Sequence, residues 1–317
     1  MVVKKGTDIK KKIEDTVTRT LAFYGVKSVI AGVSGGADST ALLLALTQSN
    51  AEIYAVHCNF HLRGEESMRD QRVVEDFCKN HGIQLKVVDF DVDAFRLDNP
   101  MSVEMACRDL RYEEFRSLKT EMNADRIAIA HNADDNIETL LLNLFRGSGV
   151  TGLRAMIPDN GEIIRPLLEI PRIEIEEYVT AKKERYIVDS SNLSSDYRRN
   201  FLRNEIIPML ETRWKGVRKA ISSSIVNLRS EANVLKWAGR EWLREANFLP
   251  LQTISDSPDK FWIIYRFASA HGATRDVALE ILDVFYKKGG KQTIVGKSWK
   301  SGKGRLIFVM KGLKYEE

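Results

Sequence analysis

The chain has 317 residues, of which 44% are hydrophobic and 29% are charged, and its formal net charge at pH 7 is +4. This length suits about two domains of roughly 100–200 residues each, and the globular balance excludes a largely disordered chain. No apolar run approaches the roughly 20 residues that span a bilayer, and none follows the five lysines within Met1–Lys12. We therefore expect a cytoplasmic protein without a signal peptide or membrane segment.

The cysteine pattern excludes a disulfide framework. Cys58, Cys78 and Cys107 are odd in number, widely spaced and form no CxxC pair. Such spacing also disfavours a cysteine-bound zinc or iron–sulfur site. We expect three buried or half-buried free thiols.

In the first half of the chain, short β-rich runs alternate with longer helical patterns. The predicted strands cover 27–33, 52–58, 84–89 and 125–130, and the predicted helices cover 37–49, 66–81, 102–121 and 132–146. Ser102 is the expected N-cap of the third helix, and a short turn is expected at Asp93–Phe95. The alternation is typical of βαβ units and predicts an α/β fold with a doubly wound, mostly parallel sheet. Ligands of such sheets bind at the carboxyl ends of the strands.

The pattern changes after Gly147. Residues 148–159 are predicted to form a loop, a helix over 171–184 begins after Pro171, and a helix over 203–210 is expected to stop at Pro208. Further helices are predicted over 217–247 and 275–287, followed by a strand pair at 292–295 and 306–310. With a boundary at Lys215-Gly216, we expect a larger domain over 1–215 and a smaller, mainly helical domain over 216–317.

Positive charge is concentrated in the last third of the chain. Ten lysines and arginines accompany four acidic residues between Asp196 and Arg240, and seven accompany none between Lys287 and Arg305. This asymmetry favours a polyanionic partner, although short basic stretches are also common on solvated surfaces.

The sharpest local signal is SGGADS, which begins at Ser34 between a predicted strand and a predicted helix. Gly35 and Gly36 allow the backbone to approach an anion, and amides at the helix N-terminus point toward it. Ser39 adds a hydroxyl group, and Asp38 suits a Mg²⁺ ion that bridges phosphate oxygens. No lysine follows the glycines, so this is neither the GxxxxGK[ST] P-loop nor a GxGxxG motif.

Two further groups of polar side chains are expected near this loop, a histidine pair at a strand end and a charged set on one helix face. His57 and His61 lie near the end of the second predicted strand, where structural histidines are the alternative. Glu104, Arg108 and Arg111 share one face of the helix over 102–121. Two guanidinium groups on one stripe suit a polyphosphate, and an exposed salt bridge is the alternative.

His131 ends the fourth predicted strand, and Asp135 and Glu138 lie one turn apart on the helix that follows. Acidic residues at a helix N-terminus often complement the helix dipole. A carboxylate pair that faces a nucleotide would also suit an amine or a metal ion.

The motif SGGxDS resembles that of the PP-loop ATP pyrophosphatases, which cleave ATP between the α- and β-phosphates and adenylate a substrate oxygen. Across residues 26–210, the ordered set HCNFHLR, HNADDNIET, RGSG, Arg165-Pro-Leu167, Asp189–Asn192 and RNFLR resembles the bacterial tRNA(Ile)-lysidine synthases. The resemblance implies that ATP with Mg²⁺ activates the wobble cytidine of the isoleucine tRNA with a CAU anticodon. Free L-lysine would then displace AMP to form lysidine.

The resemblance also implies roles for individual residues. Asp38 would hold Mg²⁺, Arg111 and His131 would stabilise charge at the α-phosphate, and Asp135 and Glu138 would receive the lysine amine or a metal, one of them as general base. The expected ATP-binding residues are Ser34, Gly35, Gly36, Ala37, Asp38, Ser39 and His57. The expected tRNA-binding residues are Arg198, Arg199, Arg203, Lys215, Arg218 and Lys219. Trp214, in the same basic stretch, is expected in the core rather than as a stacking group.

Three alternatives stay open at this level. A cytidine thiolase would need paired or catalytic cysteines, an amidotransferase-type synthetase would need an ammonia source, and a nucleotide- or tRNA-binding module would have lost its catalytic residues. Longer family members carry a further C-terminal domain, so the sequence resembles the short form or a truncated chain. A homodimer is compatible with such folds.

Overall fold

The computed structural model describes residues 2–187, 198–242, 247–287, 298–302, 304–309 and 311–316, with side chains described except at 2–7, 237–242 and 287. The chain divides into two compact units, Met1–Ser230 and Glu231–Glu317. The division falls within helix α11 (Val217–Trp242), whereas the sequence predicts a boundary at Lys215-Gly216.

The first unit is built on a parallel five-stranded sheet in the order β3-β2-β1-β4-β5. Its strands are β1 (Ser28–Gly32), β2 (Glu52–Asn59), β3 (Gln84–Asp89), β4 (Arg126–Ala128) and β5 (Ile163–Ile164). Strands β1 to β4 confirm the four predicted strands and the expected α/β class. The short β5 has no predicted counterpart, because two residues are too few to show a period.

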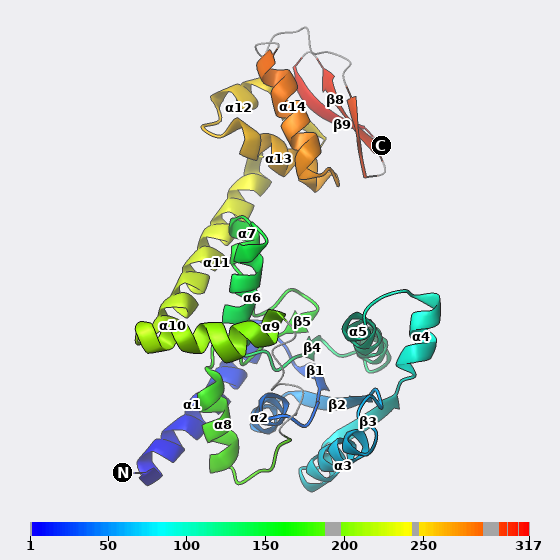
Figure 1. Ribbon diagram of the computed structural model, residues 1–317, viewed down its shortest axis with the longest axis vertical. Helices are drawn as coiled ribbons and strands as arrows, with labels where there is room; N and C mark the ends of the chain where they lie inside the picture. The colour runs from blue at the N-terminus through cyan, green and yellow to red at the C-terminus, as the bar shows by residue number, and fades with distance from the viewer. Residues whose placement is uncertain are drawn as a thin grey trace. The chain divides into compact units, whose positions relative to one another are not determined.

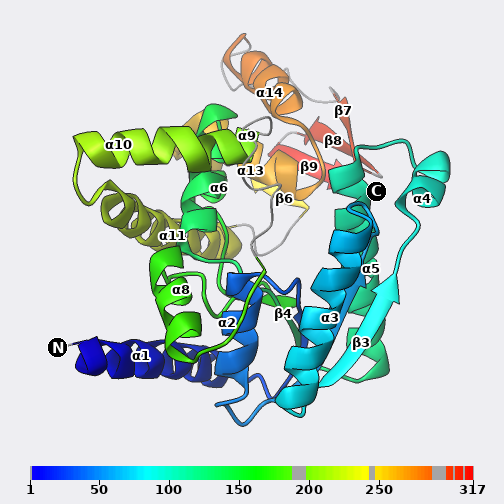
Figure 2. The same cartoon turned by 60° about the horizontal axis from the view of Figure 1, so that its bottom comes forward.

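Alternate residues of each strand pack on opposite faces of the sheet, as the strand pleat requires. Val29 and Ala31 of β1 belong to the cluster that also contains α1, α2, α3 and α8, whereas Ile30 packs with Phe115 of α5 on the other face. In both ribbon views α1, α2 and α8 lie together on one side of the unit (Figures 1 and 2). The sheet is therefore covered on both faces, as the near-continuous apolar run of β1 indicates.

Most of the predicted helices are confirmed in position, with ends that differ by a few residues. They are α2 (Ala37–Leu46), α3 (Glu65–Asn80), α5 (Val103–Glu121), α6 (Ala133–Phe145), α8 (Arg172–Ala181) and α11 (Val217–Trp242). Ser102 caps α5 by accepting a hydrogen bond from the backbone amide of Met105. Pro171 is the N-cap residue of α8.

Other helical segments of the first unit differ from the predictions or were not predicted. The long α1 (Val2–Phe23) precedes the sheet, α4 (Val92–Asp98) replaces the turn expected at Asp93–Phe95, and α7 (Val150–Leu153) lies in the expected loop. The side chain of Asp91 accepts a hydrogen bond from the Ala94 amide at 2.9 Å and starts α4, a capping signal that explains the difference.

Pro208 does not end a helix, so the stop expected there is wrong. The chain is helical from α9 (Arg198–Phe201) through the π-helical turn η2 (Leu202–Ile206) to α10 (Ile207–Arg213). Pro208 lies in the first turn of α10, where the missing amide hydrogen costs little. The wider turn before it also removes the regular hydrogen-bond ladder that a proline would interrupt.

The second unit packs helices against an antiparallel sheet in the order β6-β9-β8-β7. The strands are β6 (Phe248–Pro250), β7 (Ser298–Ser301), β8 (Gly304–Val309) and β9 (Gly312–Glu316), and the helices are α12 (Leu251–Asp256), α13 (Lys260–Ala270) and α14 (Arg275–Lys287). Strand β8 and helix α14 confirm two predictions. The strand predicted at 292–295 lies outside the described residues, and β8 instead pairs with β7 and β9.

Candidate active site

The SGGADS loop lies at the carboxyl end of β1, where it leads into α2. The Ser39 hydroxyl donates to the Gly36 carbonyl at 3.1 Å and accepts from the Ser34 amide at 3.2 Å, while the Ser34 and Ser39 hydroxyls lie 3.2 Å apart. Ala37 is buried at the first position of α2. These internal bonds hold the loop in one shape before any ligand arrives, with the amides of the first turn unpaired within the helix.

Gly35 is the position where only glycine fits. Its φ is +82°, and a Cβ built there would lie 2.3 Å from Cδ1 of Ile187. The Ile187 amide donates to the Gly35 carbonyl at 2.9 Å, and an isolated parallel bridge joins Gly36 to Ile187. A segment far along the chain thus packs against the back of the loop.

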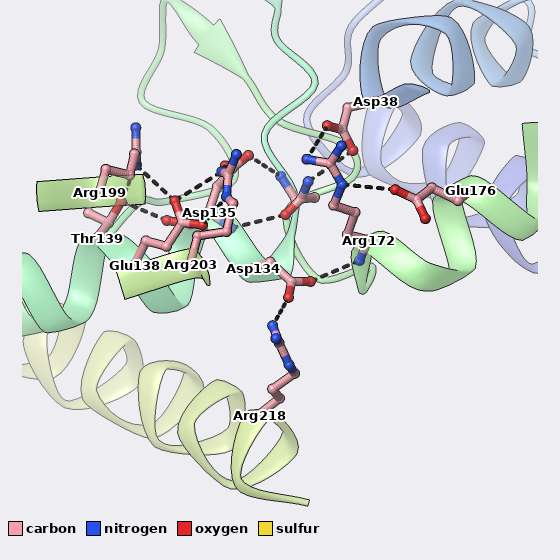
Figure 3. Close-up of polar contacts among 11 residues, drawn as sticks. Asp38, Asp134, Asp135, Glu138, Thr139, Arg172, Glu176, Arg199, Arg203 and Arg218 are labelled. Atoms are coloured by element: carbon pink, nitrogen blue, oxygen red, sulfur yellow. Dashed lines mark hydrogen bonds and ion pairs between the residues drawn. The ribbon is translucent and has the colours of Figure 1, made fainter. Parts of the chain in front are cut away.

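Asp38 is the acidic group of this loop, and it is held by two side chains from other elements. The side-chain Nδ2 of Asn132 donates to its Oδ1 at 2.9 Å, and Nη1 of Arg172 lies 3.8 Å from its Oδ2. Arg172 is in turn bound through Nε to Glu176 at 3.0 Å (Figure 3). Burial raises the pKa of Asp38, and Arg172 and Asn132 oppose this shift.

The acidic pair comes from the first turn of α6. The Asn132 side chain caps this helix by accepting from the backbone amide of Asp135 at 3.0 Å, and the Asp135 carboxylate accepts from the backbone amide of Asn132 at 3.2 Å, which completes a capping box. Glu138, one turn later, is fully buried. Because Asn132 also donates to Asp38, one side chain links the SGGADS loop to the acidic pair.

Two arginines from the helical segment 198–206 already contact this pair. Arg203 donates through Nε to Glu138 at 2.6 Å and through Nη2 to Asp135 at 2.9 Å. Nε of Arg199 lies 2.9 Å from Glu138, and its Nη2 donates to Thr139 at 2.9 Å (Figure 3). Burial raises the pKa of Glu138, and the hydrogen bond from Arg203 opposes this shift.

His131 follows the end of β4, whereas Arg111 lies on helix α5. The Nε of Arg165 donates to Nδ1 of His131 at 3.1 Å, and burial lowers the pKa of His131 to about 4. Arg111 lies over the ring of Phe60, 5.2 Å from the ring centre, and Arg108 lies over Tyr112 at 4.9 Å. Among the residues that the structure describes, no ion pair forms between Glu104 and either arginine. The two guanidinium groups on this helix face are instead held by cation–π contacts with aromatic rings.

His57 is buried, and it supports the loop from the neighbouring strand. Its Nδ1 lies 2.9 Å from the carbonyl of Val33, the residue before Ser34, and burial lowers the pKa of the ring. His61, in contrast, is exposed and contacts Asp89 at 2.7 Å.

The candidate tRNA-binding residues separate into two groups. Arg199 and Arg203 contact the acidic pair, and Arg218 contacts Asp134 and Glu211. Arg198, Lys215 and Lys219 are exposed and form no ion pair with any described residue. The side chain of Trp214 is 60% exposed, so the prediction that it belongs to the core is wrong; it follows α10 in extended conformation.

Sequence reasoning missed the linking groups of the site. Asn132 carries a recognisable signal, because an Asn three residues before an acidic residue is a capping pattern. Arg172 carries none, since its contact with Asp38 joins residues far apart in the chain. Asp189–Asn192, part of the motif set, lies outside the described residues.

Comparison with known proteins decides the family. A family profile described as a PP-loop domain matches residues 7–210. A tRNA(Ile)-lysidine synthase from Bacteroides thetaiotaomicron is 32% identical over 316 residues, which cover 98% of this chain and 73% of that protein. This chain belongs to the tRNA(Ile)-lysidine synthase family.

Other members of the tRNA(Ile)-lysidine synthase family extend beyond the matched region. The protein from Porphyromonas gingivalis W83 is 38% identical over 83% of this chain, and the match covers 59% of that protein. Among solved structures, the U34-tRNA thiolase from Methanococcus maripaludis, with its [4Fe-4S] cluster, superposes with a TM-score of 0.58 at 24% identity, over 70% of this chain and 79% of that chain. The last likeness concerns the fold alone.

Proposed function

We propose that this chain joins L-lysine to C2 of the wobble cytidine of the isoleucine tRNA with a CAU anticodon, forming lysidine, AMP and pyrophosphate. As a member of the tRNA(Ile)-lysidine synthase family with a PP-loop domain, the chain is an ATP-using, tRNA-modifying ligase. The observation that carries the detailed proposal is the Asn132 side chain, which binds Asp38 of the PP-loop and caps the helix that bears Asp135 and Glu138. A phosphate-binding loop is thereby joined to an acidic pair suited to an amine.

In the first step, the C2 carbonyl oxygen of the cytidine attacks the α-phosphorus of ATP. The bond from this phosphorus to the bridging oxygen breaks, and pyrophosphate leaves with that electron pair. The loop amides and the Ser34 and Ser39 hydroxyls bind the phosphates. Arg111 and His131 stabilise the negative charge that develops at the α-phosphate.

Asp38 is the residue of this chain that would hold Mg²⁺. A site with one carboxylate fits, because Mg²⁺ in nucleotide enzymes is bound by one or two carboxylates together with substrate phosphates and water. In the described part of the chain, no group of three or more His, Cys, Asp or Glu side chains suited to a metal occurs. When bound, Mg²⁺ neutralises charge on the phosphate oxygens.

In the second step, the ε-amine of lysine attacks C2, the bond from C2 to the phosphate oxygen breaks, and AMP leaves. The lysine ammonium must lose one proton to become a nucleophilic amine, and a carboxylate of the acidic pair accepts this proton. Burial raises the pKa of Glu138, which makes this carboxylate a better base than an exposed one. The lysine ammonium would share or replace the contacts that Arg199 and Arg203 make with the pair.

The rival tRNA-thiolation chemistry has little support in this chain. Cys58 is half-buried and Cys78 and Cys107 are buried, and all three are free. Burial raises the pKa of Cys58 to about 12 and that of Cys78 to about 11, so neither is a ready thiolate. These positions confirm the prediction of three buried or half-buried free thiols.

The proposal also covers the cellular location, the tRNA contacts and the oligomeric state. No described helix is long and apolar enough to cross a membrane, and a cytoplasmic location fits a tRNA substrate. The exposed Arg198, Lys215 and Lys219 are the candidates that remain available for tRNA phosphates. A homodimer and a domain boundary at Lys215-Gly216 stay predictions, to be tested by light scattering and limited proteolysis.

The decisive experiment measures radiolabelled L-lysine incorporation, with ATP and Mg²⁺, into the CAU-anticodon isoleucine tRNA and into methionine tRNA. We expect label on the isoleucine tRNA alone. Label on neither, with ATP still split to AMP and pyrophosphate on another acceptor, would keep PP-loop chemistry and reject lysidine formation.

Variants then separate the two steps. Asp38→Ala should abolish pyrophosphate release, whereas Asp76→Ala, which removes an exposed acid of α3, should leave it unchanged. Asp135→Asn and Glu138→Gln should reduce lysine transfer more than adenylation. An equal loss in both half-reactions would contradict the lysine assignment.

A further inference from the structure

The contact between Arg165 and His131 fixes more than the position of the imidazole ring. His131 follows β4, and Arg165 follows the neighbouring strand β5 directly, so both side chains emerge at the same edge of the sheet. The Nε of Arg165 lies 3.1 Å from Nδ1 of His131. No other described residue forms a hydrogen bond with this ring, which leaves Nε2 as its second polar atom.

The direction of this hydrogen bond follows from the chemistry of the two groups. Arginine is always protonated in proteins and has no acceptor, so Arg165 can only donate. Nδ1 of His131 must therefore carry its lone pair and no proton. Because a neutral imidazole carries one N–H group, that proton lies on Nε2.

Arg165 is itself held in place. Its Nη1 donates to the carbonyl of Ile157 at 3.0 Å, so two edges of the planar guanidinium are bound. Leu167 and Leu168, two and three residues later, are buried and anchor the backbone on which Arg165 sits. The guanidinium is thus a rigid donor rather than a mobile surface charge.

We propose that Arg165 is a positioning residue that holds His131 as the neutral tautomer with its proton on Nε2. The ring then offers a hydrogen-bond donor to the substrate and cannot act as a general base through Nδ1. The functional part of this inference rests on the proposed role of His131 at the α-phosphate. There, the Nε2–H group donates to a phosphate oxygen on which negative charge develops.

The charges around the ring favour the same state. Arg165 from the β5 connection, Arg199 from α9 and Arg108 from α5 oppose a second proton, and Asp135 of α6 is the acidic group that favours one. Burial acts in the same direction as the arginines and lowers the pKa of the ring. A neutral donor at the α-phosphate does not exchange its proton with the substrate, so stabilisation of charge is separated from proton transfer.

The test reads the tautomer directly, by long-range ¹H–¹⁵N spectra of the full chain labelled at histidine. The chain has five histidines, and the spectrum of His131→Asn identifies the missing His131 signals. We expect a neutral ring protonated at Nε2, with a hydrogen-bonded Nδ1. A ring protonated at Nδ1, or a cationic ring at neutral pH, would overturn the proposal without any variant of Arg165.

Two variants of Arg165 extend the test to function. Arg165→Met should remove the hydrogen-bond shift of Nδ1, raise the pKa of His131 and lower the adenylation kcat by about 100-fold, as loss of an oriented donor does, with little change in the KM for ATP. Arg165→Lys keeps a donor and should restore most of both readouts. Arg154→Met, at a half-buried arginine that forms no ion pair within the described chain, is the matched control.

The outcomes separate this inference from the proposed function. Slower adenylation in Arg165→Met with an unchanged His131 spectrum would overturn the positioning role. Absence of lysidine formation by the unmodified chain would reject the proposed function, while the spectrum would still decide the tautomer.

Discussion

Glu138 shows how much a single residue of this site depends on its neighbours. Its carboxylate is 1% exposed, and an ionised carboxylate at such a depth is costly unless it is paired. Arg203 and Arg199 provide the pairing from a helical segment far along the chain. The acidic pair is therefore poised to exchange one set of cationic partners for another, which suits a transient ammonium ligand.

Removal of Arg203 should expose this dependence. We expect Arg203→Ala to lower the free energy of unfolding by about 3 kcal/mol, because breaking a buried pair leaves an uncompensated charge. Arg198→Ala, in the same helical segment but exposed, is the control and should change it by less than about 0.5 kcal/mol. Urea denaturation measures both values. Equal midpoints for the two variants would mean that Arg199 alone compensates Glu138.

His131 should leave its mark on the pH dependence of stability. Burial, assisted by the nearby arginines, lowers its pKa from the ordinary value of 6.5 to about 4. Between these pH values the unfolded chain binds more protons than the folded one, so the stability contributed by neutral His131 is complete above pH 6.5 and is lost as the pH falls toward 4.

The corresponding variant is His131→Gln, with His61→Gln, at an exposed histidine, as the control. Denaturation midpoints across that pH window should fall less steeply for His131→Gln than for the unmodified chain. Burial raises the pKa of Asp38 and Glu138, so their contribution to stability changes with pH in the opposite direction to that of His131. The unmodified chain and His131→Gln both contain these carboxylates, so the difference between their curves reports His131. Parallel curves for the two proteins would contradict the buried, neutral state of His131.

At the scale of elements, the turn from β1 into α2 depends on a contact that its own sequence does not contain. Gly35 combines a φ of +82° with the close approach of Ile187, whereas Gly25 has a φ of +66° and nothing within 4 Å of its missing Cβ. Both positions disfavour alanine on backbone grounds by roughly 1 kcal/mol. Only Gly35 adds a steric clash that moves the loop.

The pair Gly35→Ala and Gly25→Ala therefore isolates the clash. We expect Gly25→Ala to bind ATP as the unmodified chain does, and Gly35→Ala to lose at least about tenfold in ATP affinity, equivalent to about 1.4 kcal/mol. Isothermal titration measures both. Similar affinities would show that Ile187 yields without displacing the loop.

The elements that could be predicted from the sequence are those with a local signal. The apolar runs of β1 to β4, the SGGADS turn and the Ser102 cap are each legible within a few residues. The sequence pattern does not predict helix α4, although Asp91 carries a capping signal. It also predicts a helix end at Pro208, because it does not reveal the wide turn that places this proline in the first turn of α10. The contacts of Arg165, Arg172 and Arg203 join distant segments, so no local pattern reveals them.

At the scale of the molecule, the basic charge of the last third is only partly free. Arg218 is bound to Asp134 and Glu211, and Arg229 lies 2.9 Å from Glu169, so these charges support the packing of α11 against the first unit's other helices and connections. Lys215, just before that helix, and Lys219, in its first turn, remain exposed without an ion pair among the described residues. Composition alone counts all of these charges equally, whereas only the unpaired ones attract a polyanion without loss of an internal contact.

This distinction predicts the salt dependence of tRNA binding. Each phosphate contact releases counterions, so the logarithm of the binding constant should fall linearly with the logarithm of salt concentration. Lys215→Gln and Lys219→Gln should each reduce the slope by about 1 and weaken isoleucine and methionine tRNA alike, because phosphates carry no sequence information. Lys27→Gln, at the amino end of β1 and so at the edge of the sheet away from the PP-loop, is the matched control and should leave the slope unchanged. Filter binding over a salt series measures all three, and an unchanged slope in both lysine variants would place the tRNA backbone on another surface.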